Sequence, residues 1–130
     1  MSPSYRGLAI IGGGYIGLEM SQFYRRMGSR VVVIEESAQV AGHEDEDIAR
    51  ALQQLLEAEE IEFHLRAQVT SIKKRKDGVA LTLKERGAGS TELRASHLFV
   101  AKVLAVASEG PDIVSRSWMT RLTPALATLA

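Results

Sequence analysis

The chain has 130 residues, enough for one globular domain with at most an appended segment. Its 16 basic and 16 acidic side chains give a formal net charge of zero, so no long-range field attracts nucleic acid or an acidic membrane surface. The absence of cysteine excludes a disulfide framework, a thiolate metal site and thiol redox chemistry by this chain itself.

The first predicted elements are a strand, a helix and a second strand. The apolar run 8–11 is typical of a parallel strand covered on both faces, and it stops at Gly12. A helix follows, with Gly28 as its expected C-terminal cap. The β-branched run 31–34 predicts a second buried strand, which ends at Glu35. Helical spacing predicts the apolar face of the helix as Ile16, Met20, Phe23, Tyr24 and Met27.

A second helix, a third strand and a hairpin come next. The acidic run 44–47 suits the positive end of a helix dipole and opens the helix. Alternating apolar residues in 61–65 indicate a strand. The basic segment 69–76, the turn pair Asp77-Gly78 and the alternation in 79–83 predict a hairpin. The expected apolar face of the second helix is Ile48, Ala51, Leu52, Leu55 and Leu56.

The last predicted elements complete an α/β fold. The loop 87–90 leads to another short strand, and the apolar run 98–101 indicates one more buried strand. A three-stranded antiparallel β-meander is therefore expected to cross over between parallel strands. After Lys102 the apolar periodicity is lost, so we expect a domain in residues 1–101 and an irregular or partly helical tail in residues 102–130.

Three glycines between the first strand and the first helix fit the spacing G-x-G-x-x-G. Gly12 would allow the tight turn, Gly14 would let the backbone approach a pyrophosphate, and Gly17 would let the helix pack closely on the strand. The free amides and the dipole of the helix start favour an anion, so no lysine is required.

Glu35 stands at the end of the second strand. A carboxylate there can accept hydrogen bonds from both adenosine ribose hydroxyls and would repel a 2′-phosphate, which favours NAD over NADP. The competing interpretation is a glycine-rich turn beside a solvated glutamate. The order strand, motif, helix, strand and acid makes the dinucleotide site the better interpretation.

With Tyr15, Ile16 and Glu19 added, the string LAIIGGGYIGLEMSQFYRRMGSRVVVIEES resembles the NAD-binding domain of the pyridine nucleotide-disulfide oxidoreductases, a family that includes dihydrolipoamide dehydrogenase and mercuric reductase. The likeness extends over about residues 6–101. It implies a Rossmann-like FAD/NAD(P)-binding three-layer fold, in which a parallel sheet is covered by helices and the β-meander. It also implies that this domain is inserted in a larger FAD-binding domain and brings NADH, whose nicotinamide passes a hydride to the flavin.

The resemblance also implies individual site residues. Glu19 would lie near the nicotinamide, with a solvated glutamate in the first helical turns as the alternative. NADP-using relatives carry arginines where this chain has Glu35 and Glu36, so NAD is again implied. The predicted cofactor-binding residues are Gly12, Gly13, Gly14, Tyr15, Ile16, Gly17, Glu19 and Glu35.

The chain also departs from the family pattern. It has no active-site cysteines, no second dinucleotide fingerprint for FAD and no C-terminal interface domain, and Lys102 begins the stretch that replaces the family's T-G-R. The resemblance therefore implies a truncated or diverged product. FAD would be held by a full-length enzyme or a partner chain. No catalytic residue is assigned here, and turnover by this chain alone is not expected.

Two other functions stay open. The chain could be a non-catalytic, dinucleotide-responsive interaction module whose tail drives self-association, for example as a homodimer. It could instead bind FAD in place of NAD, because FAD domains use the same glycine spacing. Glu19 and the meander argue against FAD.

Other partners are not expected. The basic run 73–76 fits a solvated edge strand better than a nucleic-acid patch. The three histidines lack ligand spacing, so no metal is predicted. The start of the chain lacks a secretory signal pattern, and no stretch approaches the roughly 18 apolar residues of a membrane span. A cytoplasmic location is expected.

Overall fold

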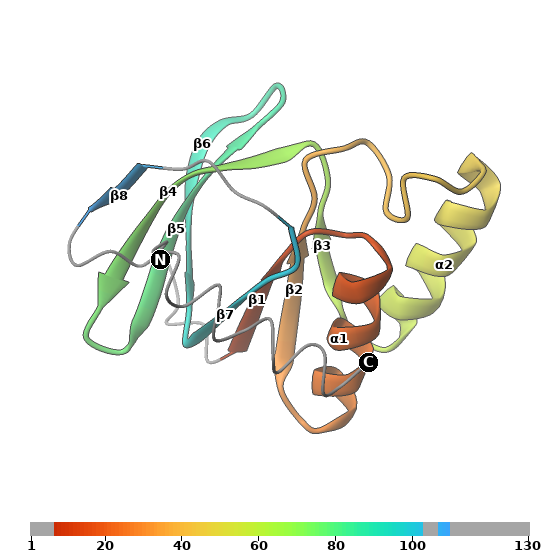
Figure 1. Ribbon diagram of the computed structural model, residues 1–130, viewed down its shortest axis with the longest axis horizontal. Helices are drawn as coiled ribbons and strands as arrows, with labels where there is room; N and C mark the ends of the chain where they lie inside the picture. Colours follow the sequence, from red (N-terminus) through yellow and green to blue (C-terminus); the bar gives the residue numbers. More distant parts are fainter. Residues whose placement is uncertain (1–6, 103–106, 110–130) are drawn as a thin grey trace.

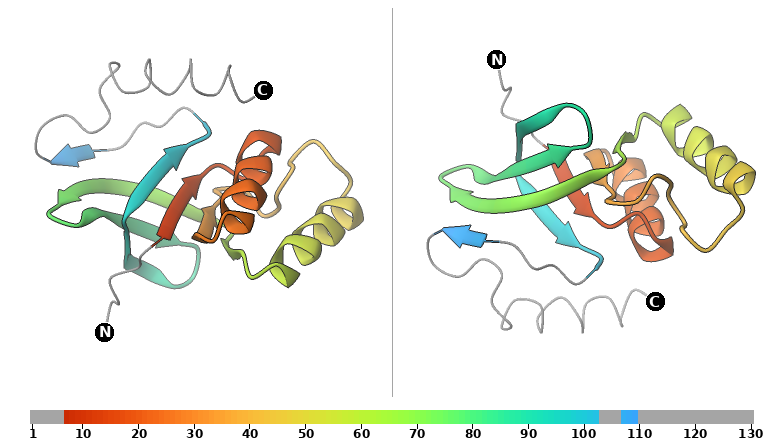
Figure 2. Two further views of the ribbon diagram at one scale, coloured as in Figure 1. Left: turned by 90° about the horizontal axis from the view of Figure 1, so that it is seen from below. Right: turned by 90° about the horizontal axis from the view of Figure 1, so that it is seen from above.

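A computed structural model describes residues 7–102 and 107–109, and these residues form three layers (Figure 1). The middle layer is a parallel sheet with the strand order β3-β2-β1-β7. Both helices lie on one face of this sheet and an antiparallel sheet lies on the other (Figures 1 and 2). The predicted α/β three-layer fold is confirmed. The middle and helical layers consist of β1 (Gly7–Ile11), α1 (Tyr15–Arg26), β2 (Arg30–Ile34), α2 (Glu46–Ala58), β3 (Glu62–His64) and β7 (His97–Val100).

The parallel strands end together at one edge of the sheet. Ile11 in β1 pairs with Ile34 in β2 on one side and with Val100 in β7 on the other. The apolar runs of the sequence form the central strands because a parallel sheet with both faces covered buries side chains on both sides of these strands. Their carboxyl ends are therefore adjacent, and this edge is where a doubly wound sheet binds its ligands.

Alternate side chains of β1 and β2 enter two separate apolar clusters. Ala9 and Ile11 face the antiparallel sheet, whereas Leu8 and Ile10 face the helices. This alternation follows from the two-residue period of a strand. Burial on both sides fixes the height and register of β1, and so fixes the place where the glycine turn begins.

The predicted β-meander is confirmed as β4 (Ala67–Arg75), β5 (Gly78–Glu85) and β6 (Gly89–Ala95), all antiparallel. The predicted turn pair was one residue late: the turn residues are Lys76 and Asp77, and Gly78 opens β5. Gly78 has φ +148°, and a Cβ on it would lie 2.1 Å from the Ala95 carbonyl oxygen. The backbone of β6 therefore requires glycine at the strand start rather than in the turn.

The segment after Lys102 contributes one element that the sequence did not predict. Strand β8 (Ala107–Glu109) pairs in parallel with β4, so the antiparallel layer gains a fourth strand. The rest of the predicted irregular or partly helical tail lies outside the described residues. The division at residue 101 stays a prediction.

The predicted apolar face of α1 was only partly correct. Ile16, Phe23 and Met27 are exposed. The helix instead buries Gly17, Leu18 and Ser21 against the sheet. Met20 and Tyr24, which were on the predicted face, are partly buried there. The reason is the close approach of Gly17 to β1. It turns toward the sheet the side of α1 that carries Gly17, Leu18 and Ser21.

The C-terminal cap of α1 is as predicted. Gly28 has φ +100°, its amide donates to the Arg25 carbonyl, and the Ser29 amide donates to the Tyr24 carbonyl. These two bonds form a Schellman motif, which satisfies the last carbonyls of the helix.

Helix α2 also buries a narrower face than its sequence pattern predicted. Leu56 is buried and Leu52 is partly buried, as expected, but Ala51, Ile48 and Leu55 are exposed. The helix lies at the margin of the helical layer (Figure 1), so only one line of side chains reaches the sheet. Within the described residues, neither helix has the length and apolar character needed to cross a bilayer.

Candidate dinucleotide-binding site

Gly12 begins a tight turn at the carboxyl end of β1. Its φ of +115° lies in the region that favours glycine, and a Cβ there would lie 3.3 Å from the carbonyl carbon of Ala101. Its amide donates to the Ile34 carbonyl at 2.8 Å. The ends of β2 and β7 therefore hold the turn from both sides.

Gly17 and Gly14 have different roles around this turn. A Cβ on Gly17 would lie 1.9 Å from the Gly12 carbonyl oxygen, so only glycine lets α1 come this close to β1. Gly14 is the N-cap residue, has no side-chain cap, and would place a Cβ in open space. The amides of the first helical turn have no acceptor within the helix. They line an open space that can accept an anion.

Glu35 closes the side of this space at the tip of β2. Its Oε1 accepts a hydrogen bond from the Gly13 amide and its Oε2 accepts one from the Ser37 amide, both at 2.7 Å. Burial by itself raises the pKa of Glu35, but these amides, with a smaller contribution from Lys102, outweigh it and hold the pKa below its usual value. The carboxylate is therefore ionised, and each oxygen can still accept from a sugar hydroxyl.

The other predicted site residues lie on the first two turns of α1. Tyr15, Ile16 and Glu19 are exposed. The Tyr15 hydroxyl donates to Glu44 Oε1, and this hydrogen bond raises the pKa of Tyr15. The structure thus brings the glycines and Glu35 into one contact network, and places Tyr15, Ile16 and Glu19 beside it on the helix.

Two alanines support the turn and were missed by sequence reasoning. The Ala41 amide donates to the Gly13 carbonyl, and the Ala101 amide donates to the Ile11 carbonyl, both at 2.8 Å. Ala41 has φ +46° in a loop that folds back onto the turn. The available signal was the apolar pair Val40-Ala41 in an otherwise polar stretch, because both residues are buried.

Lys102 also lies at this edge, although the sequence marked it only as a departure from a family pattern. Its Nζ is 3.0 Å from Glu36 Oε2. The pair joins the chain beyond β7 to the chain beyond β2, at the same end of the sheet as the glycine turn.

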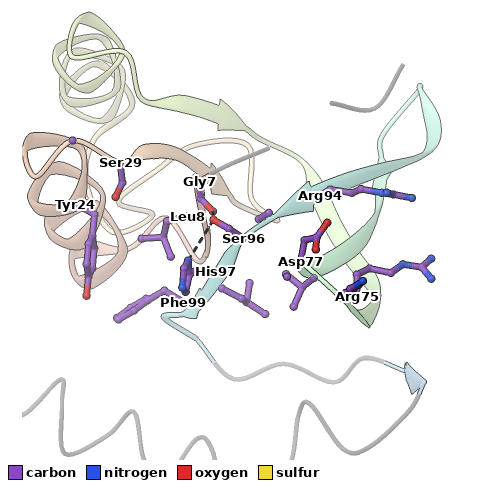
Figure 3. A pocket seen from close by; sticks show the side chains of 16 residues that line it. Gly7, Leu8, Tyr24, Ser29, Arg75, Asp77, Arg94, Ser96, His97 and Phe99 are labelled. Atoms are coloured by element: carbon purple, nitrogen blue, oxygen red, sulfur yellow. Dashed lines mark hydrogen bonds between the residues drawn. The ribbon is translucent and has the colours of Figure 1, made fainter. Parts of the chain in front are cut away.

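A groove of about 1090 Å³ lies at the opposite, amino end of the parallel sheet (Figure 3). Its lining includes Gly7 and His97 at the starts of β1 and β7, and Asp77 in the hairpin turn. Because ligands of such sheets bind outside the carboxyl ends of the strands, this groove is not the dinucleotide site. Among the described residues, no three His, Asp or Glu side chains gather in a way that could hold a metal ion.

Comparison with known sequences finds matches over most of the described domain. The model of the family described as pyridine nucleotide-disulphide oxidoreductase matches residues 7–88. The mitochondrial dihydrolipoyl dehydrogenase of Dictyostelium discoideum is 41% identical over 83 residues, which is 63% of this chain and 17% of that protein. The mercuric reductase of Streptomyces lividans is 36% identical over 94 residues, 72% of this chain and 19% of that protein. Dihydrolipoyl dehydrogenase 3 of Pseudomonas putida is 34% identical over 125 residues, 90% of this chain and 27% of that protein.

Solved structures share the same architecture. The HOCl-induced flavoprotein disulfide reductase RclA from Escherichia coli superposes with a TM-score of 0.63 and 27% identity, over 82% of this chain and 23% of that chain. An NAD-dependent persulfide reductase from A. fulgidus has a TM-score of 0.66 over 75% of this chain and 18% of that chain, and its 24% identity supports the fold alone. The chain thus spans 17% to 27% of the length of these relatives and structures.

Proposed function

The chain belongs to the pyridine nucleotide-disulphide oxidoreductase family, and we propose that its domain binds NAD(H) as the hydride-donor module of a flavin-dependent member. The family resemblance predicted from the glycine motif is confirmed. One observation carries the finer proposal: the Glu35 carboxylate is bound to the Gly13 amide, directly beside the open space at Gly14. The amides at the start of α1 form an anion cradle, and the Glu35 carboxylate beside this cradle is an acceptor for a sugar.

The first turn of α1 would bind the pyrophosphate. The amides of the first turn after Gly14 have no acceptor within the helix, and the helix dipole adds the equivalent of roughly half a positive charge. Gly14 leaves the space beside it empty because it has no side chain. Any larger residue would occupy the position where the phosphates approach the backbone.

Glu35 would bind the adenosine ribose and select against a 2′-phosphate. Its carboxylate is fixed by two backbone amides and ionised, so it can accept hydrogen bonds from the 2′- and 3′-hydroxyls. A phosphate on the 2′-oxygen would face this negative charge directly. This repulsion favours NADH over NADPH.

FAD, held by a domain or partner chain outside these residues, would accept the hydride when bound. The residues of this chain would bind and orient the nicotinamide dinucleotide, and we propose that Glu19, an exposed residue on the second turn of α1, lies near the nicotinamide. The chain has no cysteine, so any disulfide chemistry of the whole enzyme must be carried elsewhere.

Calorimetric titration of the full chain with NADH, NADPH and FAD tests this proposal. We expect NADH to bind more tightly than NADPH. Glu35→Arg should weaken NADH binding by at least about tenfold, because it removes hydrogen bonds to a charged acceptor, and should shift the preference toward NADPH. Glu57→Arg is the matched control, since Glu57 is exposed on α2, away from the glycine turn. Tighter binding of FAD than of NADH would favour the alternative dinucleotide and contradict the proposal.

A further inference from the structure

The Lys102–Glu36 ion pair crosses the edge of the sheet at the glycine turn. Lys102 lies two residues beyond β7 and Glu36 two residues beyond β2, and β1 runs between these strands. Two strand spacings are about 10 Å. Because Nζ and Oε2 are 3.0 Å apart, the two side chains together bridge the end of β1. Gly12 and Gly13 lie at that end.

The backbone next to Lys102 is held by contact with the turn, whereas its ammonium is held by an exposed ion pair. The Ala101 amide donates to the Ile11 carbonyl, and Ala101 packs against Gly12. The Lys102 side chain is 32% exposed and that of Glu36 is 56% exposed. An ion pair this exposed contributes little net free energy, so an anionic ligand can draw the ammonium away from Glu36.

The acidic side chains at this edge would repel a pyrophosphate, and the Lys102 ammonium opposes this repulsion. Glu35 and Glu36 place two carboxylates beside the cradle, and the helix dipole offsets only about half of one charge. A doubly charged pyrophosphate would approach a negative edge if Lys102 were absent. The Lys102 ammonium lies 3.0 Å from the carboxylate of Glu36, the neighbour of Glu35, and makes the smallest contribution to the lowered pKa of Glu35.

We propose that the Lys102 ammonium binds the pyrophosphate of the dinucleotide, and that Glu36 pairs with this ammonium when no dinucleotide is bound. This inference rests on the proposed dinucleotide function. It assigns the phosphates two sources of positive charge: the amides at the start of α1 on one side, and Lys102 from the end of β7 on the other.

The test separates the phosphate from the rest of the nucleotide. Calorimetry measures binding of ADP, adenosine and adenosine 2′-phosphate to the unmodified chain and to Lys102→Met. We expect ADP to bind roughly tenfold more weakly to the variant, since one hydrogen bond to a charged group is lost. Adenosine, which has no phosphate, should bind with unchanged affinity. Lys102→Arg keeps the charge and should retain most of the ADP affinity.

Two further variants sharpen the result. Glu36→Gln removes the competing carboxylate, so it should tighten ADP binding, the opposite of the lysine variant. Lys76→Met removes the same charge from the hairpin turn near the other end of the sheet, and it should leave ADP binding unchanged. Circular dichroism and the thermal midpoint of each variant establish that it is folded.

The outcomes also separate this inference from the proposed function. If the chain prefers NADH but Lys102→Met binds ADP as well as the unmodified chain does, the inference is wrong and the function stands. Equal weakening of ADP and adenosine would make Lys102 a structural residue only. Selective weakening of adenosine 2′-phosphate would assign the ammonium to the ribose and overturn the pyrophosphate contact. If the unmodified chain binds neither NADH nor ADP, both proposals fail.

Discussion

The glycines of the turn are required for different reasons, and the structure separates those reasons residue by residue. Gly12 is required by its positive φ, and Gly17 by a carbonyl oxygen that leaves no room for a Cβ. Gly14 has an ordinary φ of −77° and open space around it, so the fold itself does not require glycine there. The proposed pyrophosphate, and not the fold, would account for glycine at position 14.

Alanine substitutions at Gly17 and Gly14 should therefore affect different properties, stability in the first case and NADH binding in the second. Gly17→Ala forces α1 away from β1, and we expect the free energy of unfolding to fall by about 1–3 kcal/mol. Gly14→Ala should change it by less than about 0.5 kcal/mol but should weaken NADH binding. Urea unfolding followed by circular dichroism, with calorimetry for NADH, measures both. Similar losses of stability in the two variants would refute the distinction.

At the scale of elements, α2 covers the sheet with a single line of side chains. Leu56 is 4% exposed, and its neighbour Leu55 is 68% exposed. The two positions carry the same residue in the same helix, so a comparison between them isolates burial from helix propensity.

Leu56→Ala should lower the free energy of unfolding by about 2–5 kcal/mol, because it removes buried methyl groups and leaves a cavity. Leu55→Ala should change it by less than about 0.5 kcal/mol, because its side chain is already in water. Chemical denaturation of both variants gives the comparison. If Leu55→Ala were as costly as Leu56→Ala, the face assigned to α2 would be incorrect.

The strands and the glycine turn could be predicted from the sequence because each depends on neighbouring residues. The β-branched run 31–34 is typical of a strand buried on both faces, and a glycine motif after such a strand favours the observed turn. The rotation of α1 could not be predicted, because its inward face contains Gly17 and Ser21, neither of which is apolar. The pairing of Lys102 with Glu36 could not be predicted either, because the two residues follow strands that lie on opposite sides of β1. Such contacts depend on topology and leave no local pattern.

At the scale of the molecule, the three layers together position the carboxyl ends of the parallel strands. The helices and the meander bury both faces of the parallel sheet, which fixes the ends of β1, β2 and β7 relative to one another. The turn, the carboxylate of Glu35 and the ammonium of Lys102 all project from these ends. The candidate site is therefore built at the strand ends, and the loop at Ala41 supports its turn.

We expect this chain to bind NADH without catalysing its oxidation. The matched part of the chain covers only 17% to 27% of the length of these relatives, and the chain lacks the thiols that reduce a disulfide. We expect the purified chain to bind NADH but, when FAD and a small disulfide are added, to oxidise it no faster than a protein-free control does. The near-ultraviolet absorbance of NADH measures the rate, and calorimetry of the same sample establishes binding. The Glu35→Arg variant is the control for any oxidation that depends on the site. Oxidation that is faster with the unmodified chain and is abolished by Glu35→Arg would show that these residues complete a catalytic site with free FAD, and that hydride transfer needs no further domain.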